Sequence, residues 1–352
     1  METSTTHHRR GARRSALAAA CAANSFRDGR WVHTPSPFPA SLACSNYTFA
    51  NDTCAPKELS VGGLCHSLRQ TSSLLMVGDS LMLHAFLALL EFTGAKERVE
   101  PCDSNPVNAS GVAPGKLSKR LPCHPCCCRA FTLPCKPRGI RIRFVRHNHL
   151  LGEFLPNPAP SVNCVSLSCR KTLGLRTTCT TWRRPGSLRY ADTLLLGTGS
   201  HLEEVPRNRT GPPTGLHQGP RGGARSVGMT FLGGGDDIFE RRAAELASFV
   251  SGAYASSRVV YLASSWGELH FSPTFTGPHE AEPKPHPKYS WDVIPHVNAE
   301  YTRAMRNRRF VVVDPSTALS RRRDCRKDYM HSYLGVYIGS TWRLLQAAFA
   351  SL

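Results

Sequence analysis

A serine stands at the junction of two apolar segments in the stretch SSLLMVGDSLMLHAFLALL, residues 72–90. The first apolar run predicts a buried strand and the second a helix, so Ser80 would lie in the first turn of that helix. There the helix dipole and free N–H groups stabilise negative charge, including the oxyanion of a tetrahedral intermediate. Gly78 permits a tight turn and close substrate approach. The pattern suits a serine nucleophile, and it equally suits a serine that merely starts a helix.

A serine nucleophile requires a base, and one of the fifteen histidines has a carboxylate at a suitable spacing. Asp328 and His331 are three residues apart in KDYMHSYLGVY, so both side chains can project from one face of a helical turn. Asp328 would then accept a hydrogen bond from the imidazole and fix its tautomer. The alternative is that Asp328 caps a short helix and that His331 is near it incidentally.

The elements that must position these residues are short apolar segments alternating with helical patterns. Strands are expected at residues 74–77, 140–150, 191–201, 258–265 and 309–315, and helices at 81–92, 238–254, 297–308 and 339–352. This alternation predicts an α/β fold with a mostly parallel sheet covered on both faces. Ligands of such sheets lie beyond the carboxyl ends of the strands, the edge at which we expect Ser80, Gly199 and Ser264.

Composition and charge limit the class of protein. The 352 residues are 41% hydrophobic, which excludes a largely disordered chain. The net charge of +19 favours an anionic partner, such as an acidic polysaccharide, nucleic acid or a membrane surface. The aromatic interleaving of single-strand nucleic-acid grooves is not evident, so we expect no specific nucleic-acid partner. No run reaches the 18 or so apolar residues of a transmembrane helix.

Cysteine usage indicates an oxidising compartment. Thirteen of the 14 cysteines precede residue 180, namely Cys21, Cys44, Cys54, Cys65, Cys102, Cys123, Cys126, Cys127, Cys128, Cys135, Cys164, Cys169 and Cys179, and Cys325 follows alone. Disulfides are expected, and four N-x-S/T sequons agree with that, at Asn46, Asn51, Asn108 and Asn208. We therefore expect the secretory pathway, in the Golgi lumen or outside the cell.

The chain divides into three predicted regions. Residues 1–24 form a basic tail or a weak signal segment, 25–70 a Cys-rich wrapping segment, and 71–352 the catalytic domain, with a Cys-rich irregular insertion at 100–137 and a Gly/Pro loop at 205–235. The run CHPCCC suits disulfides better than zinc, so no metal site is expected. Trp266 and Trp291 are candidates for stacking on sugar rings, although core packing is the commoner fate of tryptophan.

The motifs GDSL (78–81) and D-x-x-H (328–331) resemble those of the SGNH/GDSL hydrolase superfamily. More closely, the chain resembles the PC-esterase group, which includes the trichome birefringence-like polysaccharide O-acetyltransferases. Further similar segments are FRDGRWV (26–32), ADTLLLGTGSH (191–201), VVYLASSWGELHF (259–271) and ALSRRRDCRKDYMH (318–331). The resemblance extends in order over residues 26–349 and implies a three-layer α/β/α SGNH-like fold.

The resemblance also implies a mechanism. Ser80 would attack an acetyl donor with His331 as base and Asp328 as its orienting partner, and the acetyl-serine would pass its acetyl group to a sugar hydroxyl or to water. No bound cofactor is implied, and acetyl-CoA or an acetylated carrier would be the co-substrate. The oxyanion and substrate contacts would come from Gly78, Asp79, Gly197, Gly199 and His201.

Three departures from the family pattern bear on acceptor specificity. Gly197 replaces the Asn before T-G-H, Ser200 begins the stretch that replaces H-W-W, and Leu334 replaces the Pro after the catalytic histidine. The hypotheses are therefore a glycan O-acetyltransferase, a carbohydrate esterase, or a non-catalytic basic protein that binds glycan or nucleic acid. The intact Ser80, Asp328 and His331 favour the two enzymes.

Overall fold

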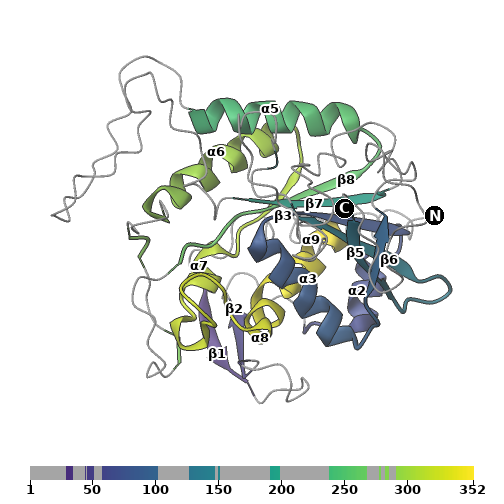
Figure 1. The fold of residues 1–352 in the computed structure, drawn as a ribbon, viewed down its shortest axis with the longest axis horizontal. Helices are drawn as coiled ribbons and strands as arrows, with labels where there is room; N and C mark the ends of the chain where they lie inside the picture. Colours follow the sequence, from purple (N-terminus) through teal and green to yellow (C-terminus); the bar gives the residue numbers. More distant parts are fainter. Residues whose placement is uncertain are drawn as a thin grey trace, which may run out of the picture.

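The fold is built on a mostly parallel β-sheet (Figure 1). The computed structural model describes residues 29–34, 44, 46–50, 58–101, 127–146, 150, 191–198, 238–267, 277–278, 282–284 and 291–352. Within these residues the main sheet has seven strands in the order β4-β5-β6-β3-β7-β8-β9. Their bounds are β3 Ser73–Gly78, β4 Arg98–Pro101, β5 Cys127–Leu133, β6 Ile140–Arg146, β7 Thr193–Gly197, β8 Arg258–Leu262 and β9 Val311–Val313.

The strand pairs from β6 to β9 are parallel, and the two pairs at the β4 end of the sheet are antiparallel. Strand β3 pairs in parallel with β6 and β7, and β7, β8 and β9 continue the parallel run. Strand β5 is antiparallel to both β6 and β4. The predicted α/β class with a mostly parallel sheet is therefore confirmed. Strand β3 is buried along its whole length, which agrees with the apolar run before Ser80.

Helices cover both faces of the sheet (Figure 1). They are α2 Val61–Ser67, α3 Ser80–Thr93, α5 Ile238–Ala253, α6 Ile294–Asn307, α7 Ser316–Ser320, α8 Leu334–Tyr337 and α9 Arg343–Ser351. Side chains of β3 alternate between the two faces of the sheet. Leu74 and Met76 pack in the hydrophobic cluster that contains residues of α3 and α9. Leu75 and Val77 pack in the cluster on the other face, which contains residues of α5 and α6. Helix α3 is thus fixed on one face, directly after the central strand.

A separate hairpin at the N-terminal end packs near α7 and α8 (Figure 1). Its strands are β1 Arg30–His33 and β2 Tyr47–Ala50, paired antiparallel. Among the described residues, two disulfides join segments distant in sequence, Cys44–Cys325 and Cys65–Cys135. The expectation of disulfides is confirmed for these four cysteines. Cys123 and the neighbouring cysteine at 126 lie outside the described residues.

Three elements differ from the sequence expectations. Residues 127–133, expected to be part of an irregular insertion, form strand β5. Residues 61–67, within the predicted wrapping segment, form helix α2. The last helix begins at Leu334 rather than at 339, and a π-helical turn at Ile338–Trp342 separates α8 from α9. In the described part of the chain, no helix combines the length and hydropathy needed to cross a bilayer.

Candidate active site

Ser80 is the first residue of α3 and follows β3 after a single intervening residue. The carboxylate of that residue, Asp79, accepts a hydrogen bond from the backbone N–H of Leu81 at 2.9 Å and caps the helix. Asp79 is 1% exposed, so the structure gives it a capping role. The N–H of Ser80 belongs to the first helical turn, where no intrahelical acceptor exists. That N–H can therefore donate to an oxyanion near the serine.

Two glycines allow α3 to pack closely against the ends of strands β3 and β7. Gly78 and Gly197 lie directly opposite each other in the parallel register of β3 and β7. A Cβ on Gly78 would overlap the carbonyl oxygen of Gly197, and a Cβ on Gly197 would lie 2.8 Å from Cε of Met82. Met82 of α3 thus packs onto bare backbone at the strand ends. Both glycines have a packing role, and a substrate contact for either of them stays a prediction.

His331 is presented by a tight hairpin at residues 325–333. Arg326 and Ser332 form an antiparallel bridge, and the backbone N–H of Lys327 donates to the carbonyl of His331 at 2.7 Å. The guanidinium of Arg326, which is 2% exposed, donates to the carbonyl of Met330 at 2.6 Å. These bonds hold both arms of the hairpin and so fix the position of His331.

Asp328 lies at the tip of this hairpin and contacts His331 directly. One carboxylate oxygen accepts hydrogen bonds from the backbone N–H groups of Met330 at 2.8 Å and His331 at 2.7 Å. The other lies 2.8 Å from Nδ1 of His331. The structure therefore brings Asp328 and His331 together as their spacing predicts, although the element is a hairpin turn and not a helix.

The second ring nitrogen of His331 has no hydrogen-bond partner among the described residues. With Nδ1–H donated to Asp328, a neutral imidazole carries its lone pair on Nε2. This nitrogen is buried and has no hydrogen-bond partner within the described residues. The predicted hydrogen bond between Ser80 Oγ and His331 Nε2 is therefore not formed in this structure. Catalytic hydrogen bonds are often long before substrate binds, and the complete triad stays a prediction.

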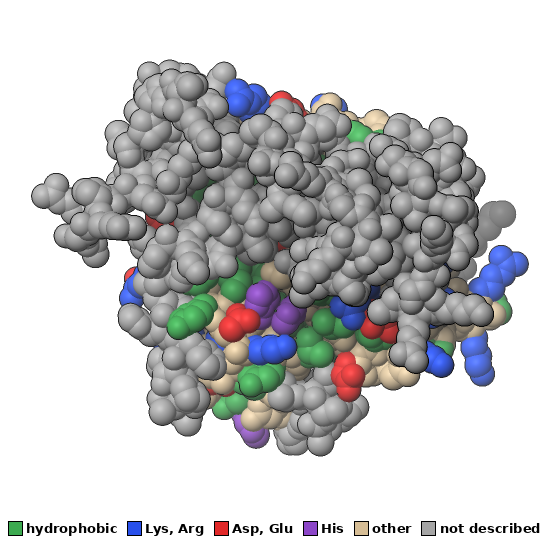
Figure 2. Space-filling view, in the orientation of Figure 1, with side chains coloured by type: hydrophobic (Ala, Val, Ile, Leu, Met, Phe, Trp, Pro, Cys, Tyr) green, Lys and Arg blue, Asp and Glu red, His purple; other side chains and the backbone are tan. Residues whose placement is uncertain are grey.

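His84 connects the serine helix to His331. The two imidazole rings are stacked, with centroids 4.5 Å apart and an interplanar angle of 18°. Nδ1 of His84 also lies 3.4 Å from the carbonyl oxygen of Ser332. His84 is four residues after Ser80 on α3, so the stack joins His331 to the helix that begins at Ser80. Figure 2 shows histidine side chains at the surface of this face, with acidic and hydrophobic ones beside them.

The hydrogen bonds and burial of these groups shift two pKa values. Burial opposes the charge on Asp328, but the hydrogen bonds from the backbone and ring of His331 and from the N–H of Met330 prevail and lower its pKa. Burial, with the nearby His331, lowers the pKa of His84 to about 4. Near neutral pH the stack therefore pairs a neutral His84 ring with a His331 ring whose partner carboxylate is ionised.

The N-terminal hairpin holds the segment that leads to His331. Arg322 is fully buried, and its guanidinium carbon lies 4.8 Å from the ring centroid of Trp31 and 4.7 Å from that of Tyr47. The indole N–H of Trp31 also donates to the carbonyl of Ala318 at 3.0 Å. Both aromatic rings come from the β1–β2 hairpin, so the hairpin clamps the chain upstream of the Asp328–His331 pair.

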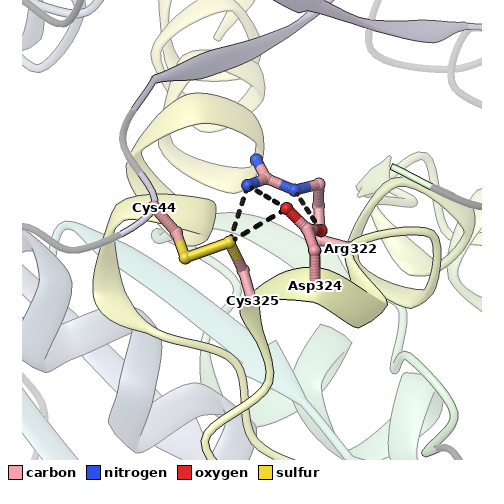
Figure 3. The surroundings of a disulfide bond; sticks show 4 residues. All are labelled: Cys44, Arg322, Asp324 and Cys325. Carbon is pink, nitrogen blue, oxygen red and sulfur yellow. Dashed lines mark hydrogen bonds and ion pairs between the residues drawn. A yellow bond between two sulfur atoms is a disulfide. The ribbon is translucent and has the colours of Figure 1, made fainter. Parts of the chain in front are cut away.

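A disulfide and an ion pair complete this clamp (Figure 3). Arg322 forms an ion pair with Asp324 at 2.9 Å, and its Nη2 lies 2.7 Å from Sγ of Cys325. The bond from Cys325 to Cys44 ties the same segment covalently to the chain three residues before β2. Because Cys325 is also the first residue of the His331 hairpin, the disulfide restrains the hairpin at its base.

The remaining candidates are placed as follows. Gly199 and His201 lie outside the described residues. Ser264 follows β8 and is buried, and it lies at the predicted carboxyl edge together with Ser80. Trp266 and Trp291 are 7% and 1% exposed in the core, so neither is available to stack on a sugar. Within the part of the chain that is described, no three potential metal ligands cluster.

Two residues of this site were missed by sequence reasoning. His84 carried a usable signal, because a residue four positions after a candidate nucleophile shares its helix face. Arg322 carried none, because its run RRRD reads as a solvated charge cluster and its burial depends on Trp31 and Tyr47 from the opposite end of the chain.

Comparison with protein families and with curated proteins finds no match for this sequence. One similar solved structure is that of a peptidoglycan O-acetylesterase, with 8% sequence identity and a TM-score of 0.34, covering 82% of this chain and 94% of that chain. A likeness at that level carries no argument about activity. It gives no support to the trichome birefringence-like resemblance, which stays a hypothesis.

Proposed function

We propose that the chain is a serine-dependent O-acetyltransferase of SGNH-like three-layer fold that acts on polysaccharide or glycan hydroxyls. The observation that carries the proposal is the His84–His331 stack, because it joins an Asp-oriented imidazole to the helix that begins at Ser80. Helices on both faces of a mostly parallel sheet support the fold assignment. The order GDSL then D-x-x-H supports the chemistry.

The reaction has two balanced steps. In the first, Ser80 Oγ attacks the carbonyl carbon of an acetyl donor, its proton passes to His331 Nε2, and that proton goes to the leaving group as the acetyl bond to the donor breaks. In the second, an acceptor hydroxyl gives its proton to His331 and attacks the acetyl-serine, which releases Ser80 with the proton returned. Acetyl-CoA or an acetylated carrier is the proposed donor, and a glycan, favoured as acidic by the +19 charge, is the acceptor.

Hydrolysis is the second candidate function, and one observation favours it. The side chains of Asp328 and His331 are 48% and 24% exposed, so water reaches the outer part of the pair, although Nε2 itself is buried. Transfer in preference to hydrolysis requires that water be kept from the acyl-enzyme. A carbohydrate acetylesterase of the same fold is therefore the alternative. The two disulfides support a secretory location for either enzyme.

The experiment is to incubate the protein with p-nitrophenyl acetate and to follow nitrophenol release and intact mass. Wild type is expected to release nitrophenol and to gain one acetyl group on Ser80. Ser80→Ala is expected to do neither, and Ser351→Ala, a serine at the far end of α9, is the matched control. Added glycans distinguish the two enzymes by the appearance of acetylated sugar. Equal inactivity of wild type and Ser80→Ala would overturn both.

A further inference from the structure

Two tyrosines flank His331 at the surface. Among the described residues, the exposed large hydrophobic side chains are Val32, Tyr329, Tyr333 and Leu352. Tyr329 is 54% exposed and Tyr333 is 42% exposed, and both lie two residues from His331 in sequence. Single exposed hydrophobic side chains are ordinary, but a pair on either side of a candidate catalytic base is a surface feature that the proposed chemistry leaves unexplained.

The backbone places Tyr333 on the same side as His331. Ser332 is 2% exposed and bridges to Arg326, whereas the residues on either side of it are partly exposed. Tyr333 has an extended backbone (φ −62°, ψ 153°), and its N–H donates to the carbonyl of Cys325 at 2.9 Å. In an extended segment alternate side chains share a face, about 7 Å apart along the chain. Tyr333 and His331 therefore belong to the same face of this segment, on either side of the buried Ser332.

The surroundings of the tyrosines are polar. Lys327 is exposed, and the Asp328 side chain is 48% exposed beside Tyr329. A rim with charges of both signs suits a polyhydroxylated ligand and not a lipid chain. A tyrosine ring offers an apolar face to the C–H face of a sugar and a hydroxyl to its polar edge, at little cost in side-chain entropy.

We infer that Tyr333, assisted by Tyr329, is a stacking platform for a sugar ring of the acceptor glycan. The inference rests on the proposed function for its role, because Tyr333 shares a face of the hairpin with His331, the base that must accept the proton of the sugar hydroxyl. It assigns the specificity for a carbohydrate acceptor to the hairpin that carries the base. Trp266 and Trp291, the other candidates for stacking on a sugar, lie in the core.

The test is a binding measurement that does not require turnover. In a Ser80→Ala background, calorimetric titration is carried out with cellohexaose, an oligogalacturonide and chitohexaose. At least one is expected to bind, and Tyr333→Ala is expected to weaken that binding at least about fivefold. Tyr333→Trp is expected to retain it. Val32→Ala, which removes an exposed hydrophobic side chain from β1, is the control and is expected to bind like the parent.

The outcomes separate this inference from the proposed function. If no glycan binds, or if Tyr333→Ala and Tyr333→Leu bind as tightly as the parent, the platform is overturned, whatever the wild type does to p-nitrophenyl acetate. If the wild type leaves that ester untouched but glycan binding depends on Tyr333, the acyl chemistry fails and the platform stands. Melting temperatures of the variants establish that a loss of binding is not a loss of fold.

Discussion

The imidazole rings of His84 and His331 lie nearly parallel, 4.5 Å apart, and so connect the start of helix α3 to the hairpin of the Asp328–His331 pair. His84 is neutral near pH 7 because burial and the neighbouring His331 lower its pKa to about 4. A neutral aromatic ring is a favourable neighbour for a base that becomes positive when it accepts a proton. The stack therefore holds His331 beside α3 and also places a neutral ring next to the charge that His331 gains on protonation.

We expect His84→Ala to slow ester hydrolysis about 2- to 30-fold, because a cation–π contact of about 0.5–2 kcal/mol with the protonated His331 is lost. His84→Phe retains an aromatic ring and should keep most of the rate, whereas His84→Lys adds a positive charge and should be the slowest. The measurement is kcat with p-nitrophenyl acetate. Equal rates for His84→Ala and the wild type would show that the stack does not assist the base.

The same histidine makes stability depend on pH. Its pKa is about 4 in the folded chain, against 6.5 for a histidine in water, so below pH 6.5 the unfolded chain binds the proton more readily. The stability associated with neutral His84 is complete above pH 6.5 and is lost as the pH falls towards 4, to a total on the order of 3 kcal/mol. His84→Phe should flatten this part of the profile of unfolding free energy. Parallel profiles for the two proteins would contradict the assignment.

Asp328→Asn should abolish most activity with little loss of stability. The amide oxygen can still accept from the backbone N–H groups of Met330 and His331, so the hairpin is retained. The amide N–H₂ cannot accept from Nδ1, which favours the wrong imidazole tautomer and lowers kcat by up to about 10⁴-fold. Ester hydrolysis and thermal unfolding are measured together. A variant that is active as well as folded would remove Asp328 from the mechanism.

The two disulfides should differ in what they support. Cys44–Cys325 joins residues 281 apart and Cys65–Cys135 joins residues 70 apart. Loop-closure entropy assigns them about 6 and about 4 kcal/mol, respectively. Replacing both cysteines of the first pair by alanine should lower stability and also ester hydrolysis, because the base of the His331 hairpin is released. The equivalent change in the second pair should lower stability alone, and equal losses of activity would argue against a positioning role.

Gly78→Ala should destabilise the chain by about 1–3 kcal/mol, because its Cβ would overlap the Gly197 carbonyl and lie 2.7 Å from Cβ of Met82. Gly252→Ala in α5 is the control, since no atom lies within 4 Å of a Cβ there. It should stabilise by roughly 0.5–1 kcal/mol through helix propensity. Chemical denaturation measures both, and a neutral Gly78→Ala would show that the strand ends can separate without cost.

The elements around Ser80 could be predicted because local rules and burial agree there. The apolar run of β3, the capping Asp79 and the periodic residues of α3 each indicate the same boundary. Strand β5 could not be predicted in the same way, because it begins inside a Cys/Pro-rich stretch without visible alternation. The β1–β2 hairpin was missed because its strands are four residues long and are separated by a long segment.

The features of the site that the sequence does not predict depend on contacts between residues far apart in the chain. The number of cysteines indicates disulfides but not which pairs form, so the Cys44–Cys325 bond has no sequence signature. Likewise, IRIRFVR predicts a strand with one wet face, but Arg143 is 7% exposed and donates to Ser73 Oγ, because β6 lies inside the sheet. The contact between Asp328 and His331 could be predicted from their spacing, since both residues lie in one turn of the chain.

The order of the site along the chain has a consequence for its synthesis. Ser80 leaves the ribosome about 250 residues before His331, which at about 5–20 residues per second is roughly 10 to 50 s. During that interval the helix that begins at Ser80 lacks His331, and Cys44 lacks Cys325, its partner in the folded chain. In the growing chain the proposed nucleophile Ser80 is therefore unreactive, because it acquires its proposed base only after residue 331 has been translated.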